Sequence, residues 1–184
     1  MSSFVQPSGK VPIIETERLR LRAHRPEDFA DCAAMWADPD VTRFIGGRPL
    51  TEEDVWARLL RYVGHWSWMG FGYWAIEEKA TGSFAGDMGF ADWKRDIEPS
   101  IKGVPEVGWV LSRHMHGKGL ATEAVRAALA WGDPRFRTVH SGLGRTVCII
   151  HPEHARSIRV AQKCGFQELQ RTTYHGEPTI LFAR

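Results

Sequence analysis

A glycine-spaced turn leads directly into an alanine-rich segment at residues 116–124, HGKGLATEA, immediately after an apolar stretch that is a candidate strand. Glycines at 117 and 119 allow the backbone to come close to a bound anion. The first amides of the following helix lack intrahelical partners, so their N–H groups and the positive end of the helix dipole would face that anion. The segment is therefore either a phosphate-binding turn or a strand-to-helix connection without a ligand.

A second strand and helix follow nearer the C-terminus. Residues 147–150, VCII, are apolar without alternation, as expected for a central strand covered on both faces. Residues 153–164 are then predicted to be a helix that Gly165 stops. Together the two segments resemble the acetyl-CoA-binding half of the GNAT acyltransferases, whose Arg/Gln-x-x-Gly-x-Gly/Ala loop corresponds to residues 116–121 of this chain.

Further motifs extend the resemblance to the RimJ/RimL-type branch of that family. They are ETERLRLR at residues 15–22, GYWAI at 72–76, EVGW at 106–109 and SIRV at 157–160. In family order they cover the chain from about residue 14 to residue 182. The resemblance implies an acetyl-CoA-dependent N-acetyltransferase with the GNAT fold, an α/β fold whose mixed, mostly antiparallel central sheet carries helices on both faces.

Length and composition are those of one enzyme-sized domain. With 184 residues and 43% hydrophobic content the chain can bury one core, and we expect a flexible lead over residues 1–11 and a single domain over residues 12–184. The 24 basic residues against 22 acidic ones give a net charge of +2, which favours neither direct nucleic-acid binding nor a membrane surface. No apolar run approaches the roughly 20 residues of a membrane helix.

Cysteine and histidine usage predicts a reduced, cytoplasmic protein without a metal site. Cys32, Cys148 and Cys164 are odd in number and lack C-x-x-C spacing, and the chain starts without a signal-peptide pattern. The histidine pairs at 114/116 and 151/154 have no cysteine that completes a zinc spacing.

Hydrophobic periodicity predicts alternating strands and helices. Leu19 and Leu21 alternate with arginines at positions 18, 20 and 22, which indicates a strand whose arginines are solvated. A capping box at Thr51 begins a helix that is expected to end near His65. The apolar face expected for it consists of Val55, Trp56, Leu59, Leu60 and Val63. The other expected elements are a helix at residues 26–36, strands at 72–77, 83–92 and 104–111, a helix at 119–131, a strand at 146–150, a helix at 153–164 and strands at 166–173 and 179–182.

The resemblance implies which residues bind acetyl-CoA. The backbone of Trp109, Val110 and Leu111 would pair with the pantetheine arm like an added strand, and the turn after it would hold the pyrophosphate. The residues of this turn and helix start are His116, Gly117, Lys118, Gly119, Leu120, Ala121 and Thr122. His116 departs from the usual Arg or Gln and would contribute less charge. His154 stands in place of the usual Asn, so it is either a pantetheine contact or a surface histidine.

Acetyl transfer to an amine needs a deprotonated nucleophile and a proton donor for the leaving thiolate. Glu106, at a position where this branch often carries an acidic residue, is the predicted base. Alternatively, Glu106 is an exposed strand carboxylate without a catalytic role, and solvent removes the proton. Asp87 and Asp92 are rival candidates for the base. Where many GNAT enzymes place a tyrosine acid, this chain has Ala161. Ser157, one turn earlier on the same helix, is therefore the predicted acid and a further cofactor contact, with direct release of the thiolate to solvent as the alternative.

Aromatic residues concentrate in the half of the chain that the family uses for the acceptor. Most are expected in the core. Trp68, Phe71, Tyr73 and Trp93 are the predicted acceptor contacts, and the polar loop at residues 94–99 is predicted to be mobile and to overhang the acceptor site. The predicted acceptor is a protein N-terminus, with small-molecule amines as the close alternative. A sensor that binds acetyl-CoA without turnover is the rival function, and both a monomer and a homodimer are compatible with the sequence.

Overall fold

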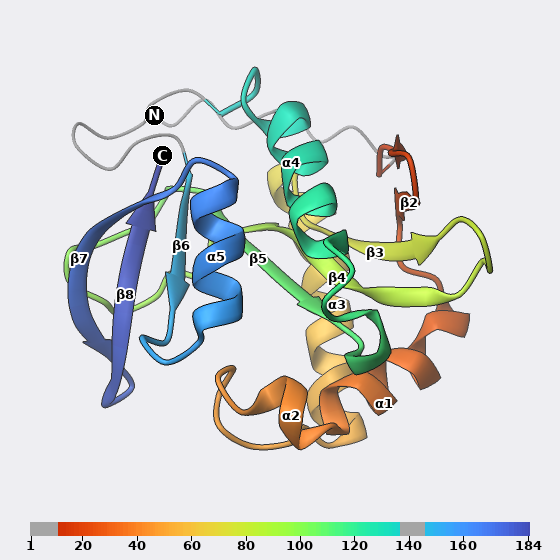
Figure 1. The fold of residues 1–184 in the computed structure, drawn as a ribbon, viewed down its shortest axis with the longest axis horizontal. Coiled ribbons are helices and arrows are strands. Elements are labelled where there is room, and N and C mark those ends of the chain that lie inside the picture. The colour runs from red at the N-terminus through yellow and green to blue at the C-terminus, as the bar shows by residue number, and fades with distance from the viewer. Residues whose placement is uncertain (1–10, 137–145) are drawn as a thin grey trace.

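The computed structural model describes residues 11–136 and 146–184, so the expected lead over residues 1–11 lies almost wholly outside the described part. The described residues form one eight-stranded sheet with helices on both faces (Figure 1), which confirms the predicted fold class. The strands are β1 (Ile14–Glu15), β2 (Leu19–Arg22), β3 (Tyr73–Glu78), β4 (Phe84–Ala91), β5 (Glu106–Leu111), β6 (Val147–Ile150), β7 (Gln167–Tyr174) and β8 (Glu177–Ala183). The helices are α1 (Phe29–Ala37), α2 (Pro39–Thr42), α3 (Glu52–Met69), α4 (Leu120–Gly132) and α5 (Ala155–Lys163), with short 3₁₀ turns η1 (Pro26–Asp28) and η2 (Arg113–Met115).

Within the described ranges, strand β5 is paired with a neighbour on both sides at its Glu106 end but on only one side at its Leu111 end. Its strand order is β1-β2-β3-β4-β5-β6-β8-β7, and every neighbouring pair is antiparallel except β5 and β6. β4 and β5 pair along their length, from Gly86↔Leu111 to Ala91↔Glu106. The parallel pair of β5 and β6 has the single register Glu106↔Val147. The two central strands therefore separate toward Leu111.

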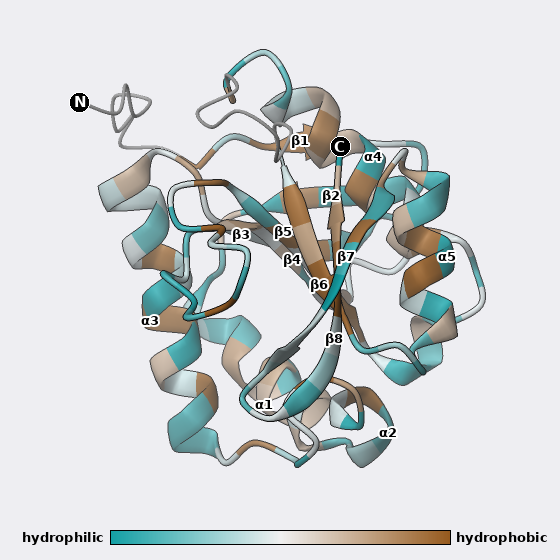
Figure 2. Ribbon diagram, turned by 90° about the vertical axis from the view of Figure 1, so that its left-hand side faces the viewer, coloured by the Kyte–Doolittle hydropathy of each residue, from teal (hydrophilic) through white to brown (hydrophobic). Residues whose placement is uncertain are grey.

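Two apolar layers hold the helices on the sheet, one on each face. Successive residues of β3 alternate between them, as the two-residue repeat of a strand requires. Trp74 and Ile76 belong to the core that α4 covers, whereas Tyr73 and Ala75 belong to the core under α1 and α3. Figure 2 shows hydrophobic residues along β5, β6 and β8 in the middle of the molecule.

Helix α3 is longer than expected and buries a narrower stripe. It begins at the predicted capping box and continues past His65 to Met69, where Gly70 ends it in a left-handed conformation with φ of 72°. The buried side chains form a single row at helical spacing: Val55, Leu59, Tyr62 and Trp66. Three residues of the predicted apolar face are half-exposed instead: Trp56, Leu60 and Val63. The prediction of a broad apolar face is wrong because the sheet covers only one row of this helix.

Arg22 contradicts the prediction that the arginines at the second strand are all solvated. Arg18 and Arg20 are partly exposed, but Arg22 is buried. Its two Nη atoms donate to the Asp28 carboxylate at 2.8 Å, and its Nε donates to Glu77 at 2.6 Å. β2 lies between β1 and β3, and η1, which carries Asp28, closes over this end of the strand, so the arginine is covered.

The loop at residues 94–99, predicted to be mobile, is packed against the sheet. Arg95 donates two hydrogen bonds to Glu106 of β5. Ile97 is buried in a small apolar cluster with Val147 and Leu181. An ion pair and an apolar anchor thus hold this loop in place.

Cys32, Cys148 and Cys164 are buried as free thiols. Within residues 11–136 and 146–184, none of the helices has the length and apolar character needed to cross a membrane.

Candidate active site

A cleft opens where β5 and β6 separate. Beyond Glu106↔Val147, the β5 backbone toward Leu111 has no strand partner on its β6 side among the described residues. A cavity of about 880 Å³ lies at this position. Trp109, Val110 and Leu111 line it together with residues of the α2 segment, the turn before α4, and α5. The structure therefore brings together the strand edge and the turn that the sequence singles out.

The turn before α4 supplies a row of free backbone N–H groups. In the part of the chain that the structure describes, none of the amides of residues 117–122 donates a hydrogen bond to a protein acceptor. Gly117 and Gly119 have φ of 78° and 79°, a conformation that glycine adopts easily. Gly119 is the N-cap of α4, so these amides lie at the positive end of the helix dipole. Gly117, Gly119 and the first three residues of α4 line the cavity, so the turn has the geometry that an anion site requires.

Positive side chains outnumber negative ones around the cavity. The cations are Arg43, Arg113, Arg156, Arg159 and Lys163, and the carboxylates are Asp40 and Glu153. Asp40 is already paired with Arg113 at 2.8 Å. The remaining positive charge, mostly on α5, favours an anionic ligand.

Two histidines line the cavity in different roles. His116 donates through Nε2 to the Leu111 carbonyl at 2.8 Å, so only its other nitrogen is free to contact the phosphate predicted for it. His154 stacks on Phe44 with 4.8 Å between ring centres. Burial, together with the charges of His116 and Arg156, lowers the pKa of His154 to about 4. Its ring is therefore neutral near pH 7 and offers one donor and one acceptor, as an asparagine amide does.

Glu106 lies at the closed end of the cleft and is bound by an arginine. Arg95 donates from Nε to one carboxylate oxygen at 2.6 Å and from Nη2 to the other at 2.8 Å. The carboxylate is buried and is absent from the cavity lining. The structure thus does not place Glu106 as an exposed strand carboxylate, and each of its oxygens keeps a lone pair that Arg95 does not use.

Ser157, the predicted acid, lines the cavity from the first turns of α5. Ala161 is fully buried in the main core, one turn further along the same helix. A larger residue at position 161 would displace core side chains, so the chain places a packing residue where the family often has an acid.

Comparison with known proteins agrees with this geometry. The sequence model of the acetyltransferase (GNAT) domain matches residues 18–167. The chain belongs to the GNAT acetyltransferase family. It is 30% identical over 173 residues to the protein YkkB of Bacillus subtilis (strain 168), an alignment that covers 92% of this chain and 93% of that one.

Solved structures share the fold of this GNAT acyltransferase over almost its whole length. A GNAT-family acetyltransferase from Bordetella pertussis has a TM-score of 0.79 and 29% identity, covering 95% of this chain and 99% of that chain. A RimL ribosomal L7/L12 acetyltransferase in complex with coenzyme A has a TM-score of 0.71 at 17% identity, covering 94% and 97%. RimL-type enzymes are thus among its structural neighbours, as the motifs suggest.

None of the predicted acceptor contacts of this acetyltransferase lines the cavity. Trp68 is 84% exposed on α3, and Phe71 is a core residue in edge-to-face contact with Phe136. Tyr73 and Trp93 lie near each other, with ring centres 5.9 Å apart. A Cβ atom at Gly108 of β5 would overlap the Tyr73 hydroxyl oxygen, so this tyrosine reaches across the sheet to the strand that borders the cleft.

Asp87, a rival for the base, is fully buried with its hydrogen bonds satisfied. His24 Nε2 lies 2.8 Å from one oxygen, and Trp36 donates to the other at 3.1 Å. Cys32 lies 3.8 Å from the first oxygen, and burial raises the pKa of its thiol, which therefore stays protonated. The potential ligand atoms of His24, Cys32 and Asp87 lie within 4.8 Å of one another, which is the spacing of a possible metal site. The hydrogen bonds that His24 and Cys32 make to Asp87 already explain why these three side chains lie together.

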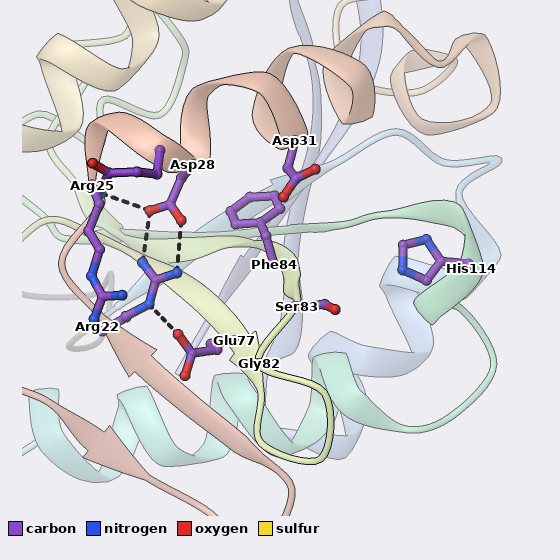
Figure 3. Close-up of a pocket in the computed structure, with 10 residues that line it drawn as sticks. Arg22, Arg25, Asp28, Asp31, Glu77, Gly82, Ser83, Phe84 and His114 are labelled. Carbon is purple, nitrogen blue, oxygen red and sulfur yellow. Dashed lines mark hydrogen bonds and ion pairs between the residues drawn. The ribbon is translucent and has the colours of Figure 1, made fainter.

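A second cavity of about 560 Å³ shares no lining residue with the first. Arg22 and its carboxylate partners Asp28 and Glu77 line one wall, as Figure 3 shows. Arg22, Asp28 and Glu77 are paired with one another, so this wall is part of the structure at the β2 end of the sheet.

The sequence reasoning missed two parts of the site. The α2 segment closes the cavity beside the start of α5, where Phe44 stacks on His154, and only the Asp38-Pro39 helix stop indicated that the chain turns there. The three cations of α5 recur at positions 156, 159 and 163, a helical spacing that signals one charged face and was overlooked.

Proposed function

We propose that this GNAT protein transfers an acetyl group from acetyl-CoA to a primary amine, by direct attack of the amine while both substrates are bound. The observation that carries the proposal is the row of free amides at residues 117–122, which faces an 880 Å³ cavity beside an unpaired strand edge. Pyrophosphate and pantetheine amides need that combination of partners. The coenzyme A complex of the structurally similar RimL enzyme supports the same cofactor.

Backbone groups are proposed to hold most of the cofactor. The amides of residues 117–122 would bind the pyrophosphate, and the β5 edge from Trp109 to Leu111 would pair with the pantetheine arm. Arg156, Arg159 and Lys163 would add attraction for the phosphates. When bound, acetyl-CoA supplies the activated thioester.

Two side chains are proposed to move protons. Glu106 would take the proton of the acceptor ammonium, directly or through water, on a lone pair that Arg95 leaves free. Ser157 would return a proton to the thiolate from the α5 wall of the cavity. Alignment of the two substrates in the cleft would supply much of the rate enhancement.

The acceptor is proposed to be a protein N-terminus, with small-molecule amines as the alternative substrate class. Tyr73 and Trp93 are the aromatic residues best placed to contact it, because Tyr73 reaches β5 at Gly108 and Trp93 contacts Tyr73. Ribosomal protein L7/L12, which that RimL enzyme acetylates, is accordingly one class of test acceptor.

The test combines calorimetric binding of acetyl-CoA with thiol release in the presence of N-terminal peptides and small amines. Amine-dependent thiol release supports the proposal and identifies the acceptor class. Tight binding without turnover on any amine would indicate a sensor, and absence of binding would overturn the cofactor assignment.

Glu106→Gln tests the base. It should lower kcat and flatten the pH–rate profile, whereas the matched variant Glu77→Gln, which also changes a buried arginine-paired carboxylate, should lower stability but not kcat. Equal kcat for Glu106→Gln and wild type would show that solvent removes the proton. Ser157→Ala is the corresponding test of the acid.

A further inference from the structure

Arg18 connects the N-terminal strand region to the anion-binding turn. Its Nη1 donates to the carbonyl oxygen of Lys118 at 2.9 Å. Its Nε and Nη2 bind one oxygen of Glu123, in the first turn of α4, at 2.7 and 2.6 Å. One guanidinium group therefore holds both the turn and the helix that follows it.

The bond to Lys118 determines the direction of the next amide. The Lys118 carbonyl and the Gly119 N–H belong to one planar trans peptide, in which the two groups point in opposite directions. Gly117 and Gly119 line the cavity, whereas Lys118 does not. With its carbonyl turned toward Arg18, this peptide points the Gly119 N–H away from Arg18, which lies outside the cavity lining.

Glu123 holds Arg18 in this position. Its other oxygen accepts hydrogen bonds from the Thr16 hydroxyl at 2.6 Å and from the Arg18 amide at 2.9 Å. Burial acts to raise the pKa of Glu123, but the hydrogen bonds from Thr16 and Arg18 outweigh it and lower the pKa, so the carboxylate is charged at neutral pH. Several hydrogen bonds to one carboxylate fix its geometry even where a surface ion pair adds little stability.

We propose that Arg18 is a positioning residue for cofactor binding, which acts through the Lys118–Gly119 peptide, and that Glu123 acts through Arg18. The inference rests on the proposed function, because the anion concerned is the pyrophosphate of acetyl-CoA. Arg18 does not line the cavity, so its effect on the ligand passes through the backbone.

The experiment measures calorimetric binding of coenzyme A, the melting temperature and the Gly119 amide resonance in Arg18→Ala. Arg20→Ala is the matched control, because Arg20, like Arg18, is a partly exposed arginine in an ion pair, but it binds Glu15 and Glu77 and does not touch the turn. Arg18→Ala should weaken binding by about ten- to a hundredfold, the equivalent of one hydrogen bond to a charged group. It should also shift the Gly119 resonance, while its melting temperature stays close to that of Arg20→Ala. With a substrate in hand, KM for acetyl-CoA should rise and kcat should not fall.

Glu123→Gln provides the second variant. It should weaken binding less than Arg18→Ala, and the double variant should bind no more weakly than Arg18→Ala alone, because Glu123 acts only through Arg18. If the double variant lost the summed affinity of the two single variants, the proposal that Glu123 acts through Arg18 would be overturned.

The outcomes separate this inference from the proposed function. If wild type binds coenzyme A and Arg18→Ala binds it equally well, the positioning role fails while the proposed function stands. A loss of affinity that is matched by a large drop in melting temperature relative to Arg20→Ala would mean a merely structural role and would also overturn it. If wild type does not bind coenzyme A, the proposed function itself fails.

Discussion

Replacing Arg22 with methionine tests the buried charge cluster at the end of β2. Methionine keeps most of the volume of the side chain but leaves Asp28 and Glu77 without their shared partner. The Arg22 side chain is 6% exposed, and its carboxylate partners are 6% and 9% exposed, so the substitution removes three hydrogen bonds from carboxylates that stay largely buried. Removing one partner from a buried ion pair costs about 3–5 kcal/mol.

Urea unfolding at neutral pH measures this loss, with Arg20→Ala as the control. Arg20 is 41% exposed, so its removal should cost only about 0–1 kcal/mol. A loss in Arg22→Met as small as that of the control would refute the reasoning that the cluster is buried and stabilising.

The pH dependence of the same loss provides a second check. Hydrogen bonds from Arg22 lower the pKa of Glu77, and they outweigh burial to lower the pKa of Asp28 as well. Such groups stabilise the fold fully above their unfolded pKa of about 4, and the contribution disappears as the pH falls through the folded pKa. The difference between wild type and Arg22→Met should therefore shrink in acid, and a difference independent of pH would contradict the ion-pair account.

Three further predictions concern the cleft. Gly119→Val should cost about 1–2 kcal/mol of stability, because φ is 79°, and weaken coenzyme A binding at least tenfold in calorimetry; unchanged affinity would contradict the backbone cradle. Gly108→Ala should destabilise the protein by about 1–3 kcal/mol in thermal unfolding, because its Cβ overlaps the Tyr73 hydroxyl, and Tyr73→Phe in the same chain should recover part of that loss. The His154 ring should titrate near pH 4 in NMR spectra, and stability should fall as the pH drops from 6.5 toward 4, since the unfolded chain binds that proton more tightly; His154→Asn should flatten this slope.

Local signals in the sequence predicted most of the elements correctly. The capping box at Thr51 forms as expected, because both of its hydrogen bonds join residues three apart. Gly119 caps the start of α4 and Gly165 follows α5, since positions that need a positive φ favour glycine. The glycines at 117 and 119 likewise adopt the positive φ that the turn before α4 requires.

Partners distant in the chain could not be predicted in this way. Glu106 was predicted to be the base because the family branch often carries an acidic residue at that strand position, but its pairing with Arg95 depends on how the loop at residues 94–99 folds back. Trp56, Leu60 and Val63 of α3 are exposed because another row of the helix meets the sheet, and the sequence does not show which row this is. Neither feature has a signal within a few residues of the position concerned.

The sequence by itself determined the family, the order of strands and helices, and the turn that can bind an anion, because glycine placement, capping and hydrophobic period act over a few residues. Only the tertiary structure decided that Arg22 is buried while Arg18 and Arg20 are not, and that Arg18 reaches Lys118, 100 residues along the chain. Which face of a strand is covered, and which distant group meets a side chain, is decided by strand pairing and helix packing across the whole sheet.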